Sequence, residues 1–430
     1  MKIEITPLRA GVCEAAGETL HVMVEVACGE VPERAKGHSN LALVIDRSGS
    51  MDGAKLEAAK QSISDLVQRL GQDDAVGVVA YDHEVETTLG LSRVPVARSV
   101  LPGLLQRMES GGSTDLHGGW LAGASMLAPD AGGAVACHVI LLSDGRANHG
   151  ETSARRICEQ VTNLCDAGIT TTTIGFGRDF NEELMTAMAR AGNGRAIYGE
   201  RVEDLADAFD EEVSLLGNLV WRDVVLSFDL PRRVEVMNGY MRHESGWRLP
   251  ALARGGSAWA MVALPMSLAA SMAERGEPLR VSVSGIDHEG RRKSFEAVWT
   301  LPPLVSADAW RDLPQDERVA RRLQELELVR LQNEIRRLVM RGRWEEAREM
   351  FEALRERART DAWLAESLPF LERLLAERDE MSMGKELAFR SMALSQRLRA
   401  SNETAFVDAC LENIRPAFLR RKSSEGRGRT

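Results

Sequence analysis

Short apolar runs and longer amphipathic stretches alternate through residues 41–217. The runs are rich in β-branched and aliphatic residues and occur at LALVID (41–46), AVGVVAYD (75–82), HVILLSD (138–144) and TTTTIGF (170–176). Helix-like amphipathic stretches lie between them, for example at residues 55–70 and 182–192. Buried parallel strands joined by crossover helices produce this alternation, so the pattern predicts an α/β domain with a doubly wound, mostly parallel sheet.

The segments on either side of this domain have the pattern of antiparallel strands. Residues 20–27 alternate between an apolar face and a second face, His21, Met23 and Glu25, that we expect to meet water. Strand-like runs separated by Gly, Pro and charged turns follow downstream at residues 223–231, 233–239, 257–266, 279–287 and 293–302. Neither flank is expected to bury a face alone, so we predict a β-sandwich built from both flanks, with the α/β domain inserted between its strands.

From about residue 306 the apolar positions follow a helical period. They recur at steps of three and four as Leu328, Leu331, Ile335 and Leu338, then Trp344, Ala347, Phe351 and Leu354, then Leu364, Leu368, Leu371 and Leu375. This spacing predicts antiparallel helices in a bundle. The predicted domains are therefore 1–37 and 218–305 for the sandwich, 38–217 for the α/β domain, 306–415 for the helical bundle and 416–430 for a basic flexible tail.

Composition and charge narrow the classes of function. The chain has 430 residues, of which 44% are hydrophobic and 27% charged, as in soluble globular proteins of several domains. The net charge of -10 argues against nucleic acid as the main ligand, because binding to the phosphate backbone requires clustered Lys and Arg. The C-terminal tail contains such a cluster, and a solvated terminus is the simpler explanation of it.

The N-terminal and cysteine patterns predict a cytoplasmic protein without membrane contact. The first 20 residues include acidic side chains and no continuous apolar region, unlike a signal peptide. No apolar run approaches the roughly 20 residues that cross a bilayer. The six cysteines are scattered without CxxC spacing, so we expect buried, reduced thiols and no zinc site.

Three short polar motifs stand at the ends of predicted strands or at the start of a predicted helix. DRSGS (46–50) closes the first run, SDG (143–145) closes the third, and GGSTD (111–115) precedes a helix-like stretch. Ligands of open parallel sheets bind beyond the carboxyl ends of the strands, where we expect these loops to meet. Three hydroxyls and two carboxylates form a hard-oxygen set suited to Mg²⁺, with Mn²⁺ or Ca²⁺ as substitutes. The candidate metal ligands are Asp46, Ser48, Ser50, Thr114 and Asp144.

With these motifs the sequence resembles the von Willebrand factor A family, which has the integrin I-type fold, and its metal-ion-dependent adhesion site. The resemblance extends to AYDHEV (80–85), IGFGRDFNEELMTAMA (174–189) and GNGRAIYGERVEDLADAFDEEVSLL (192–216), and so covers residues 38–217. It implies that Ser48, Ser50 and Thr114 ligate the cation directly or nearly so. The same resemblance implies that Asp46 and Asp144 act largely through water or as hydrogen-bond anchors.

Other polar residues near these motifs are not needed for such a site. Arg47 occupies a variable slot of the motif, and the role of Asp82 is undefined. We expect surface or hydrogen-bonding roles for His83, His117 and His149, because a hard-oxygen site does not need imidazole. No G-x-S-x-G elbow, P-loop or dinucleotide fingerprint occurs, so we expect no catalytic residue and no enzymatic activity.

A site whose direct ligands are mainly hydroxyls favours binding over catalysis. Little anionic charge is transferred to the cation, which therefore accepts a further oxygen from a carboxylate of a partner. We expect a cytosolic, bacterial-type interaction protein that binds an Asp or Glu side chain through Mg²⁺. Metal-dependent self-assembly, as a scaffold or signalling switch, is the alternative, and a metal-dependent hydrolase is favoured least. By analogy with the family, an AAA+ ATPase or a kinase or phosphatase signalling component is a candidate partner.

Overall fold

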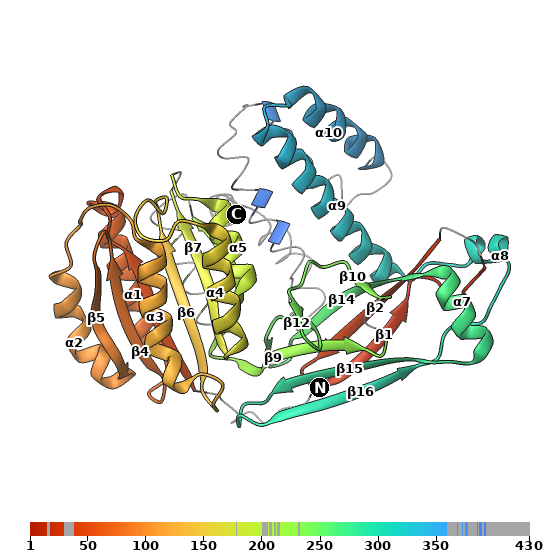
Figure 1. The fold of residues 1–430 in the computed structure, drawn as a ribbon, viewed down its shortest axis with the longest axis horizontal. Coiled ribbons are helices and arrows are strands. Elements are labelled where there is room, and N and C mark those ends of the chain that lie inside the picture. Colours follow the sequence, from red (N-terminus) through yellow and green to blue (C-terminus); the bar gives the residue numbers. More distant parts are fainter. Residues whose placement is uncertain are drawn as a thin grey trace, which may run out of the picture. The chain divides into compact units, whose positions relative to one another are not determined.

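The computed structural model divides the chain into two units (Figure 1). We name one the β unit, with Met1–Lys36 and Leu219–Val329, and the other the α/β unit, with Gly37–Asn218 and Arg330–Ala393. The main part of the α/β unit thus lies, in sequence, between the two parts of the β unit. The residues that the structure describes are 1–14, 18–29, 38–177, 179–199, 205, 209, 212, 216–230, 233–358, 368, 372, 375, 376, 385, 387, 388, 391 and 392.

A six-stranded sheet forms the centre of the α/β unit. Its order is β5-β4-β3-β6-β7-β8, in which β5 pairs antiparallel with β4 and the other pairs are parallel. The four apolar runs that predicted buried strands are confirmed as β3, β4, β6 and β7. The edge strand β5 was missed because its residues are mostly polar and exposed. The strands are β3 (Ser39–Asp46), β4 (Ala75–Tyr81), β5 (Val85–Arg93), β6 (Ala136–Ser143), β7 (Ile169–Phe176) and β8 (Asn193–Gly199).

Both faces of this sheet are covered, which explains the unbroken apolar runs of its strands. On β3, Ala42 and Val44 enter a core that they share with α3, α4 and α5, while the alternate residues Leu41 and Leu43 are buried on the opposite face. Trp120 of α3 fills the centre of the shared core and donates a hydrogen bond to Thr171. The helices are α1 (Ala54–Arg69), α2 (Val94–Gln106), α3 (Leu116–Leu127), α4 (Ala154–Asp166) and α5 (Glu182–Ala191), with 3-10 turns at η1 (Gly49–Met51) and η2 (Ala128–Asp130).

The pairing of β3 with β6 brings two strand ends together. The chain leaves β3 for β4 on one side and later returns to β6 on the other side. In open α/β sheets, ligands bind at the carboxyl edge where the strand order reverses in this way. Asp46 ends β3, and Asp144 directly follows β6, so the topology of the sheet places both residues at this edge.

Two antiparallel sheets form the β unit. Their orders are β1-β2-β14-β10 and β11-β12-β9-β15-β16, with β13 paired to β9. β2 and β14 come from opposite flanks of the sequence and pair along their whole length, from Thr19 with Pro265 to Ala27 with Ser257. Alternate residues of both sheets, such as Val24 and Val283, enter one hydrophobic core.

The elements of the β unit are mostly short strands. They are β1 (Lys2–Pro7), β2 (Thr19–Ala27), β9 (Leu219–Phe228), β10 (Glu235–Val236), β11 (Arg242–His243), β12 (Gly246–Leu249), β13 (Leu252–Ala253), β14 (Ser257–Pro265), β15 (Leu279–Ile286) and β16 (Arg292–Trp299), with helices α7 (Met266–Arg275) and α8 (Ala307–Asp312). Four of the five downstream strand-like runs correspond to the longer strands β9, β14, β15 and β16, whereas the run at 233–239 contains only the two-residue β10. The two-residue strands carry too few positions for an alternating pattern.

The first two helical series of the sequence are confirmed as α9 (Glu317–Met340) and α10 (Trp344–Ala358). Between them Gly342 has a φ of 70°, in the left-handed region that glycine adopts without strain. The third predicted series lies largely outside the described residues, although Leu368 and Leu375 are helical and buried. The predicted basic tail at 416–430 also lies outside them.

The first part of α9 covers the face of β2 that was expected to meet water. Val319 and Leu326 of α9 pack against Met23, Trp259 and Met261. Met23 is therefore only 4% exposed, and the prediction of a wet position was wrong for this residue. The alternating pattern identified the strand. It could not indicate that α9, which follows about 300 residues later in the sequence, packs on this face.

The separate helical bundle predicted over 306–415 stays a prediction, because most of the residues after 358 lie outside the described residues. α9 belongs to the β unit up to Val329, and the described helical residues that follow belong to the α/β unit. There Ala388 joins the α/β core, and the buried Lys385 donates hydrogen bonds to the Phe180 carbonyl at 3.0 Å and to Glu182 at 3.2 Å. A helical period identifies an apolar stripe but not its partner, which is why the sequence did not reveal this division.

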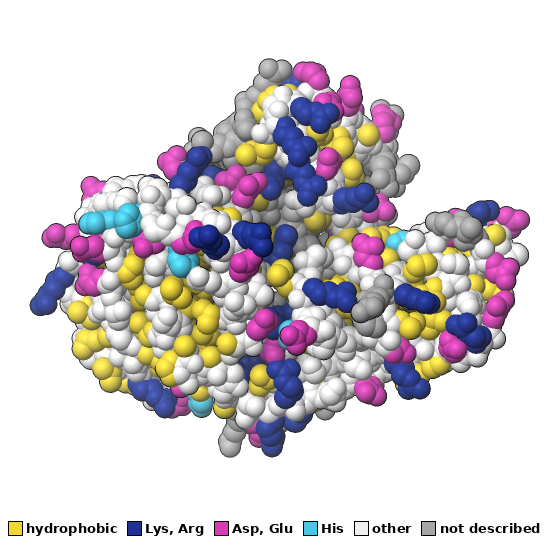
Figure 2. Space-filling view, in the orientation of Figure 1, with side chains coloured by type: hydrophobic (Ala, Val, Ile, Leu, Met, Phe, Trp, Pro, Cys, Tyr) yellow, Lys and Arg dark blue, Asp and Glu magenta, His cyan; other side chains and the backbone are white. Residues whose placement is uncertain are grey.

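The surface of the α/β unit retains some apolar side chains. Figure 2 shows them gathered over α2 and α3, and they include Val96, which is 54% exposed, Val100 and Leu121. Singly exposed apolar residues are common on protein surfaces and carry no assignment of function. In the described part of the chain, no helix combines the length and the apolar composition that crossing a membrane requires.

A buried polar cluster ties Glu212 to the central sheet. Glu212 is 1% exposed, accepts a hydrogen bond from Thr172 at 2.7 Å, and pairs with His138 at 2.9 Å and with Arg195 at 3.3 Å. Burial is the largest single effect on the pKa of Glu212 and raises it, but His138, Arg195 and Thr172 together lower it to about 2. The ionised carboxylate is therefore well compensated in the folded protein.

We expect Glu212→Gln to lower the free energy of unfolding at pH 7 by about 2 kcal/mol, because the amide cannot accept from all three partners. Since the folded pKa lies below the usual 4.5, the carboxylate stabilises the fold above about pH 4.5, and this contribution is lost as the pH falls toward 2. Urea unfolding followed by circular dichroism at pH 7 and pH 3 measures both effects. Glu57→Gln is the control, since Glu57 is 71% exposed in its pair with Lys60, and equal losses for the two variants at pH 7 would contradict the prediction.

Candidate metal centre

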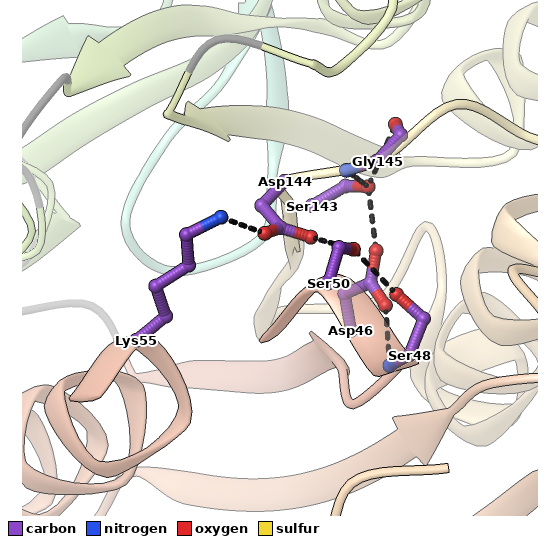
Figure 3. Close-up of polar contacts among 7 residues, drawn as sticks. All are labelled: Asp46, Ser48, Ser50, Lys55, Ser143, Asp144 and Gly145. Atoms are coloured by element: carbon purple, nitrogen blue, oxygen red, sulfur yellow. Dashed lines mark hydrogen bonds and ion pairs between the residues drawn. The ribbon is translucent and has the colours of Figure 1, made fainter. Parts of the chain in front are cut away.

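The five residues predicted as metal ligands lie together at the carboxyl edge of the sheet. A Cβ added to Gly145 would lie 3.4 Å from Thr114 Oγ1, 3.5 Å from Ser50 Oγ and 3.9 Å from Asp46 Oδ2. Oxygens from the loop after β3 and from the loop before α3 thus surround the space next to Gly145, which itself lies on the loop after β6. The other two predicted ligands are hydrogen-bonded to this group, and Figure 3 shows four of the five beside Gly145.

Direct hydrogen bonds connect the carboxylates and the hydroxyls. Ser50 Oγ donates to Asp144 Oδ1 at 2.6 Å, and the Ser48 amide donates to Asp46 Oδ1 at 2.9 Å (Figure 3). Ser143 Oγ donates to Asp46 Oδ2 at 2.8 Å, a contact that the sequence did not indicate. These bonds fix the carboxylates of β3 and of the loop after β6 in one arrangement.

Backbone hydrogen bonds join the loop after β3 to the loop before α3. The Gly49 amide donates to the Gly112 carbonyl at 3.1 Å, and the Gly111 amide donates to the Arg47 carbonyl at 2.7 Å. A Cβ on Gly111 would lie only 1.6 Å from Asp82 Oδ2, so any larger residue here would displace the Asp82 carboxylate. Main-chain contacts therefore help to set the spacing between the two loops.

Thr114 is held by the loop that follows β6. Its amide donates to Asn148 Oδ1 at 2.7 Å, and its carbonyl accepts from the amides of Asn148 and His149, each at 3.2 Å. Asn148 was missed from the sequence, because three residues of loop separate it from Asp144 and no motif marks it. Its contacts orient the backbone of Thr114, which leaves the threonine hydroxyl directed at the space next to Gly145.

The charged residues beside the motif have partners of their own. Arg47 pairs with Asp82 at 3.3 Å and with Glu86 at 2.7 Å, which gives Asp82 the structural role that the sequence left undefined. The three histidines near this edge contact residues other than the five candidates. His83 lies 3.2 Å from Asp82, His117 lies 2.7 Å from Gln160, and His149 lies 3.9 Å from Asp115.

Burial and charge act together on the carboxylates. Asp46 and Asp144 are fully buried, whereas Ser50 is exposed, so the group opens to the surface on one side. Burial above all, and to a smaller extent the charge of Asp144, raise the pKa of Asp46 to about 6, although hydrogen bonds from Ser48 and Ser143 act to lower it. Two like charges held close in a buried position favour a cation.

The donor set fits a hard dication. Neighbouring ligands of an octahedral Mg²⁺ at about 2.1 Å lie roughly 3 Å apart, and Ser48 Oγ and Ser50 Oγ are 3.1 Å apart. Within the described residues no cluster of three or more His, Cys, Asp or Glu side chains could hold a metal ion. A set of three hydroxyls and two carboxylates is a different kind of site, and its oxygens are those that Mg²⁺ prefers over softer ligands.

Comparison with known families identifies the α/β domain. The family model described as von Willebrand factor type A domain matches residues 40–211, which include all five candidate ligands. The chain contains a von Willebrand factor type A domain. Domains of this family commonly bind a divalent metal, and they serve in general in protein–protein interaction or metal-dependent adhesion.

Relatives with similar sequences share this domain and little else of their length. Protein sll0103 of Synechocystis sp. is 30% identical over 180 residues, which are 42% of this chain and 42% of that protein. Human inter-alpha-trypsin inhibitor heavy chain H3 is 31% identical over 188 residues, which are 41% of this chain and 21% of that protein. The chain thus matches less than half the length of each of these relatives.

Two solved structures resemble a larger part of the chain. The von Willebrand factor type A protein from Catenulispora acidiphila has a TM-score of 0.65 at 19% identity, covering 81% of this chain and 85% of that one. The ArnB paralog VWA2 from Sulfolobus acidocaldarius has a TM-score of 0.60 at 17% identity, covering 91% of this chain and 98% of that one. At such low identity these likenesses establish a shared fold, and this fold extends beyond the von Willebrand factor type A domain.

The raised pKa of Asp46 predicts that cation binding by the von Willebrand factor type A domain weakens in acid. Protons and a dication compete for this carboxylate, so affinity should fall about ten-fold between pH 7 and pH 5, on either side of the pKa of about 6. The stability of the cation-free protein in EDTA should depend on pH in the opposite direction from cation affinity. Because the pKa of Asp46 is raised in the folded state, this carboxyl contributes stability at low pH that is lost as the pH rises through about 6. Calorimetric titration with Mn²⁺ across this range tests the first effect, and an affinity that does not change with pH would rule it out.

Proposed function

We propose that this protein is a Mg²⁺-dependent interaction module that binds an Asp or Glu side chain of a partner protein. The proposal depends on one observation, the convergence of Ser50, Thr114 and Asp46 oxygens on the space next to Gly145. The membership of the domain in a family of interaction and adhesion domains supports it. The exposed position of Ser50 provides access from solvent.

The proposed roles follow from the charge of each ligand. Ser48, Ser50 and Thr114 would hold the cation through neutral oxygens, while Asp46 and Asp144 orient these hydroxyls and bound water by accepting hydrogen bonds. When bound, the cation supplies an electrophilic coordination position for a carboxylate oxygen. Octahedral geometry makes such a bond directional, so the partner's acidic residue must approach along a defined direction.

We further propose that the protein acts in the cytosol and without catalysis. Hydrolysis at a metal requires a placed general base, and the histidines nearest to the site pair with Asp82, Gln160 and Asp115 instead. In this proposal the two antiparallel sheets act as a β-sandwich that orients the domain, and the helical residues join a second component. AAA+ ATPases and kinase or phosphatase signalling components remain the candidate classes of partner, by family analogy alone.

The test is capture of a partner on the immobilised full-length chain in Mg²⁺, followed by elution with EDTA. We expect Thr114→Ala and Asp46→Ala to lower cation affinity at least ten-fold and to abolish EDTA-sensitive capture, because each removes an oxygen from the site. Gly145→Val should have the same effect without removing any ligand, since its side chain would occupy the space between the oxygens. Ser99→Ala is the matched control, because this exposed hydroxyl donates to the Val96 carbonyl of its own helix.

Two results would contradict the proposal. Capture that persists in EDTA and in all three site variants would place recognition elsewhere on the chain. Light scattering after gel filtration, with and without EDTA, separates an external partner from copies of the chain, because a mass that rises with Mg²⁺ indicates self-assembly. Circular dichroism of each variant checks that the fold is retained, which is a necessary control because Asp46 and Thr114 are buried.

A further inference from the structure

A lysine side chain already pairs with one of the candidate metal ligands. Lys55 Nζ lies 2.5 Å from Asp144 Oδ2, and the other oxygen of the same carboxylate accepts from Ser50 (Figure 3). Asp144 is fully buried, whereas the Lys55 side chain is 33% exposed. The carboxylate therefore has one oxygen directed at the hydroxyls of the site and one directed at an ammonium group.

Lys55 can leave Asp144 without disturbing the core. It lies in the first turn of α1, and its flexible side chain is partly exposed to solvent. Its ammonium lies 5.9 Å from the centre of the Phe176 ring, at the end of β7, and close to Gly177. A lysine chain has many rotamers, so another position in solvent is available to it at little cost in packing.

A dication and the Lys55 ammonium would repel each other across Asp144. A cation held by Ser50 and its neighbours would lie beside one oxygen of this carboxylate while the ammonium lies beside the other. Like charges this close interact strongly where water is partly excluded, and the carboxylate can neutralise only one unit of charge. Cation binding must therefore weaken or displace the lysine.

We propose that Lys55 is a tethered competitor of the divalent cation and sets the cation affinity of the site. This inference rests on the proposed function, because it assumes that the hydroxyls beside Asp144 hold a cation. The ammonium compensates Asp144 when no dication is bound, which keeps the buried carboxylate from being unpaired. The same contact raises the cation concentration at which the site fills, so that recognition of an acidic partner responds to the supply of free Mg²⁺.

The decisive variant is Lys55→Met, which retains the length of the side chain and removes its charge. We expect the full chain with this substitution to bind Mg²⁺ and Mn²⁺ roughly ten-fold more tightly than the natural chain in calorimetric titrations at pH 7.5, because the repulsion is gone. Lys55→Arg retains the charge and should stay within about three-fold of the natural chain. Lys60→Met is the matched control, because Lys60 lies on the same helix and pairs with the exposed Glu57 outside the site.

Thermal unfolding supplies a second readout that an ordinary structural role of Lys55 would not produce. Without divalent cations, Lys55→Met should unfold at a lower temperature than the natural chain, because the buried Asp144 loses its partner. Saturating Mg²⁺ should raise its midpoint by more than it raises that of the natural chain, because tighter binding stabilises the folded state more. Lys55→Gln is a second neutral variant for both measurements in case Lys55→Met does not fold.

The outcomes distinguish this inference from the proposed function. Weaker cation binding by Lys55→Met and Lys55→Gln would mean that Lys55 positions Asp144 for the cation, and an unchanged affinity would mean that the two cations do not compete. Either result overturns the inference while the cation site stands. Failure of the natural chain and of all Lys55 variants to bind Mg²⁺ or Mn²⁺ would overturn the proposed function together with the inference.

Discussion

The direct parallel pairing of β3 with β6 is the constraint on which the candidate site depends. It places the end of one strand, Asp46, beside the end of the other, where Ser143 donates a hydrogen bond to it and Asp144 follows. The loops after these strands then hold Thr114 between them through main-chain contacts. Main-chain contacts thus hold in place the loops that carry the hydroxyls and carboxylates, and a site held in this way has a lower ordering cost on binding.

Charge is the second determinant of the site. The raised pKa of Asp46 reflects the burial of its carboxylate first and the nearby charge of Asp144 only to a smaller extent. Serine and threonine hydroxyls add ligands without adding negative charge, so a cation would keep its attraction for an outside carboxylate. The contact of Lys55 with Asp144 introduces a positive charge from the chain itself. In the proposed competition, the Lys55 ammonium sets the cation affinity of the site without a change in any metal ligand.

The parts of the chain outside the α/β domain also have a defined fold. Strands from both flanks of the sequence pair directly in the β unit, and α9 begins in that unit while later helical residues belong to the α/β unit. Solved structures that cover 81% and 91% of the chain have the same fold at TM-scores of 0.65 and 0.60. The fold shared with these structures extends beyond the α/β domain, whereas the sequence relatives match mainly the domain itself.

The sequence by itself determined the elements whose signals are local. Unbroken apolar runs identified the buried strands, three- and four-residue steps identified α9 and α10, and the spacing of DRSGS, Thr114 and Asp144 identified the candidate ligands. Only the tertiary structure decided which surfaces meet. It buried Met23 beneath α9, placed Asn148 against Thr114 and brought Lys55 to Asp144. These contacts join residues far apart along the chain, and a side chain's polarity and period specify that it needs a partner without specifying which partner it finds.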